Sequence, residues 1–145
     1  MTHAIGPEAR IVVGVDGSPT SKAALDWAIR QAARTGDLVE VVTAYYWFPM
    51  PIEDIDFKSV ATRVSEDAIF GAADPGSPVK VVPKVVNGSP AKALLQEAAG
   101  AELLVVGSRG RGAVSEALLG SVSHYCVHHA PCPVVVVRGG RISPR

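Results

Sequence analysis

Hydrophobic residues along the chain fall into two alternating patterns, which predict strands and helices in turn. Short apolar runs rich in β-branched residues are typical of buried strands. Five such runs are present, at Ile11–Val15, Leu38–Ala44, Val79–Val86, Leu103–Val106 and Pro133–Val137. Between most of these runs, small and apolar residues recur at every third or fourth position, which is the spacing of one helix face.

Capping signals mark the ends of two predicted helices. Ser18 precedes Pro19, so a capping residue stands before a proline at the first helical position, and Gly36 lies where a left-handed C-terminal cap belongs. The segment Gly88–Pro90 repeats this opening ahead of a helix that we expect to end at Gly100. At both places the chain is predicted to pass from a strand through a turn into a helix.

A loop rich in proline and aromatic residues, Tyr45–Asp56, leads from the second strand to a helix whose apolar face includes Val60, Val64 and Ala68. The loop either forms a lid over a binding site or packs as an aromatic plug on one end of the core, and both interpretations stay open. A last helix is expected from Ser121 to Ala130, with Ser121 as its capping residue.

Strands that alternate with helices predict a doubly wound α/β fold, in which a five-stranded parallel sheet has helices on both faces. Pro83 interrupts the third strand and cannot donate to a sheet ladder, so this strand belongs at one edge. The run Pro133–Val137 would expose an apolar, unpaired edge on the other side, which natural proteins usually cover. We therefore expect the strand order 3-2-1-4-5 and a homodimer through the last strand.

Size and charge limit the classes of protein to which the chain can belong. Its 145 residues suit one domain, which we place at 11–138 between a flexible N-terminus at 1–10 and a flexible tail at 139–145. Fourteen basic and fourteen acidic residues leave no net charge, which argues against nucleic acid as a partner. The sequence shows neither a secretion signal nor the roughly 20 apolar residues that span a bilayer. We expect a cytoplasmic protein with no membrane partner.

Glycines follow the fourth strand at a spacing suited to binding phosphate. Gly107, Gly110 and Gly120-Ser121 form the pattern G-x2-G-x9-G-S. Glycine lets backbone N–H groups approach a phosphate closely, and a helix start adds unpaired N–H donors with partial positive charge. Arg109 and Arg111 add full charges nearby. The pattern predicts a phosphate site, and a flexible surface loop is the alternative.

The expected strand order places a second loop opposite these glycines. The direction of winding reverses between strands 1 and 4, where open α/β sheets bind their ligands. The loop Gly14–Gly17 would then face the loop Gly107–Gly112. Asp16 would accept a hydrogen bond from a ribose hydroxyl or hold a divalent ion such as Mg²⁺ shared with the phosphates, or else it would only support an Asp-Gly turn. A nucleotide fits this pair of loops.

Three other phosphate-related motifs do not match. A P-loop would need lysine where Ala113 stands, and a dinucleotide fingerprint would need glycine where Ser115 stands. A phospho-acceptor receiver domain would need several carboxylates after the first strand and a lysine after the last, where the chain has only Asp16 and Arg138.

The cysteines and histidines do not form a recognised metal motif. Cys126 and Cys132 are the only cysteines, and their spacing fits neither a disulfide framework nor a four-ligand zinc site. We interpret them as structural thiols, with redox sensing as the alternative. His124 and His128 share a helix face, but the H-E-x-x-H pattern is missing, so these and His129 are interpreted as surface or packing histidines, with metal binding as the alternative.

Three segments together resemble the universal stress protein family. They are DGSPTSKAALDWA at 16–28, VVNGSPAKALLQEA at 85–98 and LLVVGSRGRGAVSEALLGSVSHYCVHHAPCPVVVVR at 103–138. The resemblance extends over 11–138, and the glycine spacing is similar to that of the ATP-binding branch of the family. It implies an α/β fold with strand order 3-2-1-4-5, dimerisation through the last strand, and an adenine nucleotide between strands 1 and 4.

The resemblance also implies which residues contact the nucleotide. Asp16 would meet the ribose or the phosphates. The phosphates would lie on Gly107, Arg109, Gly110, Gly120, Ser121, Val122 and Ser123. The ribose and adenine pocket would be lined by Gly14, Val15, Ala44 and Val106. Arg111 and Gly112 complete the predicted nucleotide-binding set.

Three functions are compatible with such a site. The main hypothesis is a regulatory protein of the stress response, in which ATP with Mg²⁺, or another adenine nucleotide, shifts a dimer to a conformation that a regulatory partner recognises. The second is a slow ATP hydrolase or adenylyl-transfer enzyme, although no catalytic lysine or second carboxylate can be placed in the pocket. The third is a dimeric adaptor or holdase that uses only the fold.

Overall fold

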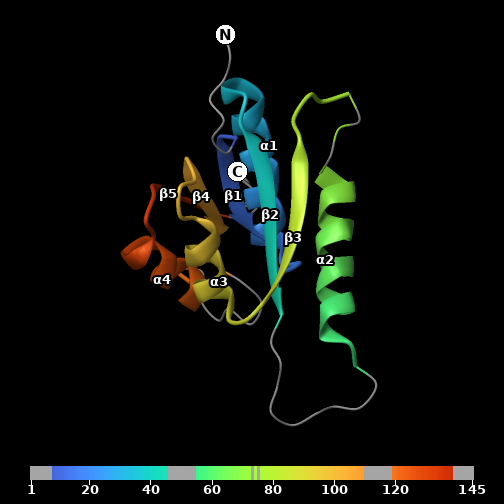
Figure 1. Ribbon diagram of the computed structural model, residues 1–145, viewed down its shortest axis with the longest axis vertical. Helices are drawn as coiled ribbons and strands as arrows, with labels where there is room; N and C mark the ends of the chain where they lie inside the picture. Colours follow the sequence, from blue (N-terminus) through green and yellow to red (C-terminus); the bar gives the residue numbers. More distant parts are fainter. Residues whose placement is uncertain (1–7, 46–54, 73, 75, 110–118, 139–145) are drawn as a thin grey trace, which may run out of the picture.

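The computed structural model describes residues 8–45, 55–72, 74, 76–109 and 119–138, which form an α/β fold (Figure 1). The strands in these residues are β1 (Arg10–Gly14), β2 (Leu38–Tyr45), β3 (Val81–Asn87), β4 (Leu103–Gly107) and β5 (Val134–Val137). The helices are α1 (Pro19–Thr35), α2 (Phe57–Ala72), α3 (Pro90–Glu97) and α4 (Ser121–His129). All pairings are parallel, in the order β3-β2-β1-β4-β5, which confirms the predicted fold class and strand order.

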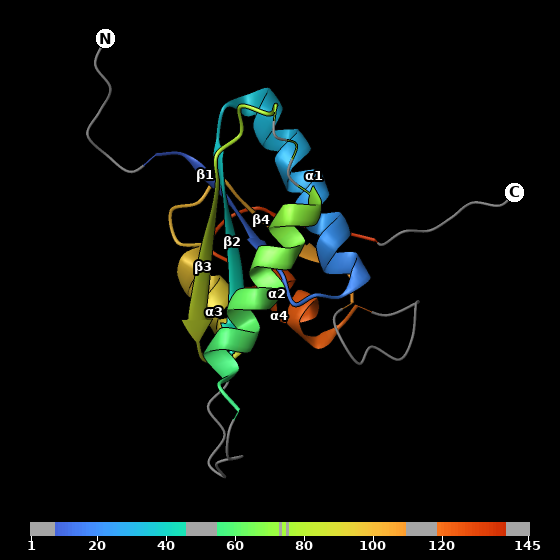
Figure 2. The same ribbon diagram turned by 90° about the vertical axis from the view of Figure 1, so that its right-hand side faces the viewer.

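Each face of the sheet carries its own hydrophobic core. On one face, Ile11 and Val13 of β1 pack with Leu25 of α1, and α2 lies beside α1 (Figure 2). On the other face, Val12 packs with Leu94 of α3 and with α4. Successive residues of a strand point to opposite faces, so a strand covered on both sides must be apolar at every position. This explains why the central strands appear in the sequence as continuous apolar runs.

β3 and β5 form the two edges of the described sheet. Pro83 lies on β3, which pairs only with β2 among the described strands, so its predicted edge position is confirmed. β5 pairs with β4, and none of the described strands lies beyond it. All four valines of β5 are half-buried.

Some element boundaries differ from the expected ones. β1 begins at Arg10, one residue before the expected start of the domain, and β3 begins at Val81 rather than at residue 79. α3 ends at Glu97 rather than at Gly100. The physical reason is that Nη2 of Arg10 donates to the carbonyls of Glu97 (2.7 Å) and Ala99 (2.9 Å). These carbonyls lie at the C-terminal end of the helix, where the backbone itself provides no partner. Gly100 follows in the turn, with φ +81°.

The predicted apolar face of α2 is wrong at one residue. Ala61, Ser65 and Ala68 are buried, whereas Val60 is 54% exposed. Because each residue of an α-helix is rotated by about 100° from the one before it, Val60 lies to the side of the stripe that starts at Ala61. These small residues, together with the partly buried Val64, therefore face the sheet from this helix.

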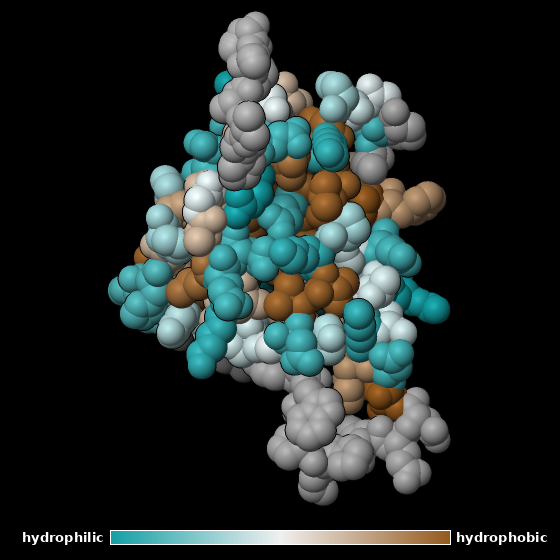
Figure 3. All heavy atoms as spheres, in the orientation of Figure 1, coloured by the Kyte–Doolittle hydropathy of each residue, from teal (hydrophilic) through white to brown (hydrophobic). Residues whose placement is uncertain are grey.

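The surface mixes polar and apolar residues. On the face drawn in Figure 3, brown apolar groups are separated by teal polar residues. Among the described residues, Phe70 on α2 is the most exposed large hydrophobic side chain. None of the helices in the described ranges has the length and apolar character that a bilayer crossing requires.

Candidate functional site

The turn after β1 is built around Asp16. Its Oδ1 accepts a hydrogen bond from the backbone N–H of Ser18 (2.9 Å), and Gly17 has φ +88°, a conformation that favours glycine. Ser18 then caps α1, because its hydroxyl accepts from the N–H of Ser21 (3.3 Å). Asp16 therefore holds the turn, as one of the two sequence-based interpretations proposed, and it does so at the carboxyl end of a central strand.

Gly14, at the end of β1, has a packing role. A Cβ atom added there would lie 2.8 Å from Cδ1 of Leu94 on α3. Glycine at this position lets α3 pack directly on the end of β1. Next to it, the backbone N–H of Val15 donates to the carbonyl of Val42 (2.9 Å), which extends the contact with β2 beyond the strand itself.

The end of β4 lies against the start of α1. A Cβ atom added to Gly107 would lie 2.6 Å from Oγ1 of Thr20 and 2.7 Å from its backbone carbon. The hydroxyl of Thr20 donates to the carbonyl of Arg109, two residues further along. The first turn of α1, which follows the β1 turn, is therefore in direct contact with the chain that leaves β4.

The carbonyl of Ser108 joins the start of α4 to the end of β4. It accepts from the N–H of Gly120 (2.7 Å) and from the hydroxyl of Ser123 (3.0 Å), while the N–H of Ser108 donates to Val137 (2.8 Å). Gly120 is the N-cap residue of α4, and Ser121 is its first helical residue and makes no capping bond, so the predicted capping role of Ser121 is wrong. The helix begins at Ser121 as expected, but Gly120 takes the cap position before it.

The other predicted contact residues lie on both sides of the sheet. Val15 belongs to the core beneath α1 and α2, and Val106 and Val122 pack in the core beneath α3 and α4. Ala44 pairs with Val86 near the end of β2 and is half-buried. The remaining predicted residues, Gly110, Arg111 and Gly112, and residues 46–54 of the predicted lid or plug loop lie outside the described residues.

Sequence reasoning missed Thr20 and Ser108, which connect these elements. Both are buried polar residues, 4% and 7% exposed. The only sequence signal is their position, because Thr20 lies in the first turn of the helix after strand 1 and Ser108 lies between two predicted site residues. Nothing in the residue types themselves indicates that their partners are backbone carbonyls.

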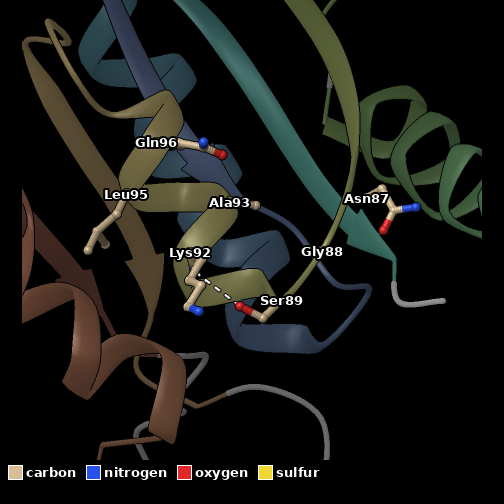
Figure 4. A pocket seen from close by; sticks show the side chains of 7 residues that line it. All are labelled: Asn87, Gly88, Ser89, Lys92, Ala93, Leu95 and Gln96. Atoms are coloured by element: carbon tan, nitrogen blue, oxygen red, sulfur yellow. Dashed lines mark hydrogen bonds between the residues drawn. The ribbon is translucent and has the colours of Figure 1, made fainter. Parts of the chain in front are cut away.

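A hollow of about 570 Å³ lies elsewhere, between the end of β3 and α3 (Figure 4). It is lined by Asn87, Gly88, Ser89, Lys92, Ala93, Leu95 and Gln96. The hydroxyl of Ser89 accepts from the backbone N–H of Lys92 (3.4 Å), which is ordinary helix capping. The side chains point in different directions in Figure 4 and do not converge on one point. None of the predicted site residues lies in this hollow.

The two thiols are not poised for redox chemistry. Burial, and to a lesser extent the neighbouring Cys132, raise the pKa of Cys126 to about 11. Burial also raises the pKa of Cys132, against the opposing effect of Arg10. Both cysteines are free. A raised pKa keeps a thiol in its unreactive protonated form, which supports the interpretation as structural residues.

Side chains that commonly bind metal ions do not gather in the parts of the chain that the structure describes. No group of three or more His, Cys, Asp or Glu residues is placed there to hold a metal ion. His124, His128 and His129 are exposed on α4. Asp16 is the acidic residue that the β1 turn brings to the predicted nucleotide site.

Comparison with known proteins agrees with this architecture. The sequence model of the Universal stress protein family matches residues 9–138. A universal stress protein of Mycobacterium tuberculosis strain H37Rv is 37% identical over 136 residues, which cover 90% of this chain and 45% of the relative. The chain thus spans less than half the length of the curated relatives that it matches.

Solved structures show the same fold. The universal stress protein UspA from Lactobacillus plantarum superposes with a TM-score of 0.75 at 22% identity, over 92% of this chain and 99% of that one. A universal stress protein in complex with cAMP superposes with a TM-score of 0.73 at 28% identity, over the same shares of the two chains. With the family match covering nearly the whole chain, this protein belongs to the universal stress protein family.

Proposed function

We propose that the chain binds an adenine nucleotide, ATP in particular, across the turns that follow β1 and β4. The observation that supports this proposal is the contact between the first turn of α1 and the chain that leaves β4, which Gly107 and Thr20 make possible. Ligands of open α/β sheets bind where the winding reverses, and here that point is the boundary between β1 and β4. The family member that forms a complex with cAMP gives independent support.

Each part of the site would have its own role. The N-terminus of α4, beginning after Gly120, supplies unpaired N–H donors and a partial positive charge for phosphate oxygens. Arg109 adds a full positive charge beside them. Asp16 would accept from a ribose hydroxyl through the carboxylate that also orders its turn. Val15 and Val106 would provide apolar contact at the strand ends.

Magnesium fits the same donor set. Mg²⁺ is usually held by one or two carboxylates together with phosphates and water, and Asp16 is a carboxylate in the turn after β1, opposite the predicted phosphate loop. When bound, the ion would neutralise phosphate charge. As the alternative to the ribose contact, we therefore propose Asp16 as the protein ligand, direct or through water, of a nucleotide-bound Mg²⁺.

We further propose that the protein is a homodimer and a nucleotide-dependent regulator in the cytoplasm. β5 has one open edge among the described strands, and its half-buried valines would be covered by a second copy. Two free thiols suit a reducing compartment. The strand order places β5 next to β4, so a change at the nucleotide turns is one strand away from the proposed dimer edge.

Isothermal titration calorimetry tests the nucleotide proposal. The ligands are ATP with Mg²⁺, ATP alone, AMP and cAMP, and the variants are Asp16→Asn and, as a control, Asp26→Asn. Asparagine retains the turn at residue 16, whereas Asp26 is exposed on α1 and pairs with Arg30. A charge-assisted hydrogen bond contributes about 1.5–3 kcal/mol, so Asp16→Asn should weaken binding about tenfold or more.

The control variant and the unmodified protein distinguish the possible outcomes of this titration. Asp26→Asn should leave the affinity unchanged. If none of the nucleotides binds the unmodified protein at millimolar concentration, the proposed function is wrong. If ATP binds but both variants behave alike, the nucleotide function stands and the role of Asp16 is wrong.

A further inference from the structure

We propose that His124 and His128 form a two-ligand binding site for a divalent transition-metal ion on the exposed face of α4. The two residues are one helical turn apart, and their ring centres lie 4.5 Å from each other with an interplanar angle of 53°. Residues four apart on a helix are neighbours on its surface. Neither residue belongs to the predicted nucleotide-binding set, and the site does not depend on the proposed function.

The spacing of the two rings matches shared coordination. With a metal–nitrogen distance of about 2.0–2.1 Å, two imidazoles bound to one ion at 90° to 109° have ring centres about 4.5 to 5.2 Å apart. The observed 4.5 Å falls in this range. His128 and His129 are 6.3 Å apart, outside it, and the ring of His129 lies 4.4 Å from that of Tyr125. His129 is therefore not the second ligand.

The helix holds the pair on a fixed backbone. Between the two histidines, Cys126 is fully buried in the core, and one residue before them the hydroxyl of Ser123 is bonded to the carbonyl of Ser108. These contacts anchor the opposite face of α4 while both imidazoles remain exposed to solvent. An ion could reach them without any movement of the fold.

The ligand atoms at this position indicate which type of ion would bind. Imidazole nitrogen suits Zn²⁺, Ni²⁺ and Cu²⁺, whereas Mg²⁺ and Ca²⁺ prefer oxygen ligands. The segment 121–129 contains no Asp or Glu, and none of the described carboxylates is within ion-pair distance of these imidazoles. With two protein ligands, water would fill the other positions, so the ion would exchange readily, unlike one in a closed structural zinc site.

Calorimetric titration of the untagged full chain with Ni²⁺, and separately with Zn²⁺, tests the site. We expect one ion per chain and no competition from Mg²⁺. His124→Ala and His128→Ala should each weaken binding at least about tenfold, since even the loss of an outer-shell partner typically costs 10- to 100-fold. His129→Ala and Cys132→Ser are matched controls and should leave the affinity unchanged.

A second measurement identifies the ligands directly. Histidine ring signals in an NMR spectrum should broaden at low Ni²⁺ for residues 124 and 128 before those of residue 129. The proposal is overturned if the double variant His124→Ala/His128→Ala binds the ion as the unmodified protein does. It is equally overturned if His129→Ala or Cys132→Ser abolishes binding. Urea unfolding of each variant shows whether the fold is intact, which these exposed positions should allow.

Discussion

Gly107 and Thr20 are in such close contact that no side chain fits at residue 107. A Cβ atom there would lie 2.6 Å from the Thr20 hydroxyl oxygen and 2.7 Å from the Thr20 backbone carbon. Backbone cannot give way as the end of a flexible side chain can. The glycine is thus required by the packing of α1 on β4, whether or not a phosphate is bound.

Gly107→Ala should therefore destabilise the protein in the absence of any ligand. Overpacking of a well-packed position costs about 1 to 3 kcal/mol. Gly71→Ala is the matched control, because a Cβ at Gly71 meets nothing within 4 Å and alanine favours the helix in which it lies. Urea unfolding should show a lower free energy of unfolding for the first variant only. Equal stability of the two variants would contradict the packing explanation.

Ser123 and Ser121 should differ in their effect on stability although they are two residues apart. The buried hydroxyl of Ser123 donates to Ser108, whereas Ser121 is exposed and makes no capping bond. Ser123→Ala should cost about 1 kcal/mol, the net contribution of a typical hydrogen bond. Ser121→Ala should stay within about 0.5 kcal/mol of the unmodified protein. Thermal unfolding of both variants measures the two effects. A larger loss of stability for Ser121→Ala than for Ser123→Ala would support the predicted capping role of Ser121.

Glu40 should make the protein less stable as the pH rises above the acid range. Burial, then the hydrogen bond and charge of Glu97, raise the pKa of Glu40, against the opposing effect of Arg10, whose Nε lies 2.9 Å from Oε1 of Glu40. A carboxyl group with a raised pKa binds its proton more tightly in the folded state. Its contribution to stability is therefore full below its ordinary pKa of 4.5 and is lost as the pH rises through the folded-state pKa.

Glu40→Gln removes this titration and retains an oxygen that can accept from Arg10. The free energy of unfolding of this variant, relative to the unmodified protein, should increase between about pH 4 and pH 7. Urea unfolding at several pH values measures the difference. If the difference is constant or decreases with pH, then the attraction of Arg10 outweighs burial, and the pKa of Glu40 is not raised in the folded protein.

Cys126 should react with alkylating reagents only when the protein opens. The thiolate is the reactive form, and a pKa of about 11 leaves very little of it near neutral pH. Because the folded-state pKa lies above the ordinary value of 9.0, the contribution of Cys126 to stability is full below pH 9 and is lost as the pH rises towards 11. Iodoacetamide labelling followed by mass spectrometry should show slow modification in buffer and fast modification in urea. Fast labelling in buffer would support redox sensing.

Val136 should matter for the proposed dimer more than for the fold. The carbonyls of Pro133 and Val137 accept from β4, so by alternation the backbone groups of Val134 and Val136 point to the open edge. Val136→Pro removes an outward N–H in each copy. At about 0.5–1.5 kcal/mol per bond, two lost bonds should raise the dimer dissociation constant about tenfold or more.

Analytical ultracentrifugation of Val136→Pro, with Val136→Thr as the control that keeps the N–H, measures this effect. An unchanged monomer–dimer equilibrium in the proline variant would mean that a dimer, if present, uses another surface. A monomeric unmodified protein would rule out the dimer itself.

Local patterns determined much of this protein. The apolar runs, the Ser-Pro openings and the edge position of Pro83 predicted the strand order, because helix caps, sheet ladders and alternation depend on a few neighbouring residues. The two loops of the candidate site followed from that order. These features need only the sequence and the rules of parallel sheets.

Tertiary structure alone decided how the loops are held. The contact of Gly107 with Thr20, the bonds of the Ser108 carbonyl and the early end of α3 at Arg10 join residues that are 12 to 89 positions apart. Such contacts depend on the distance between packed elements. When the partner is a backbone carbonyl, the type of the residue that carries it gives no indication of the contact. The sequence therefore predicted which turns form the candidate site, and the packing of α1 and α4 on β4 determined which of their groups are already bonded within the protein.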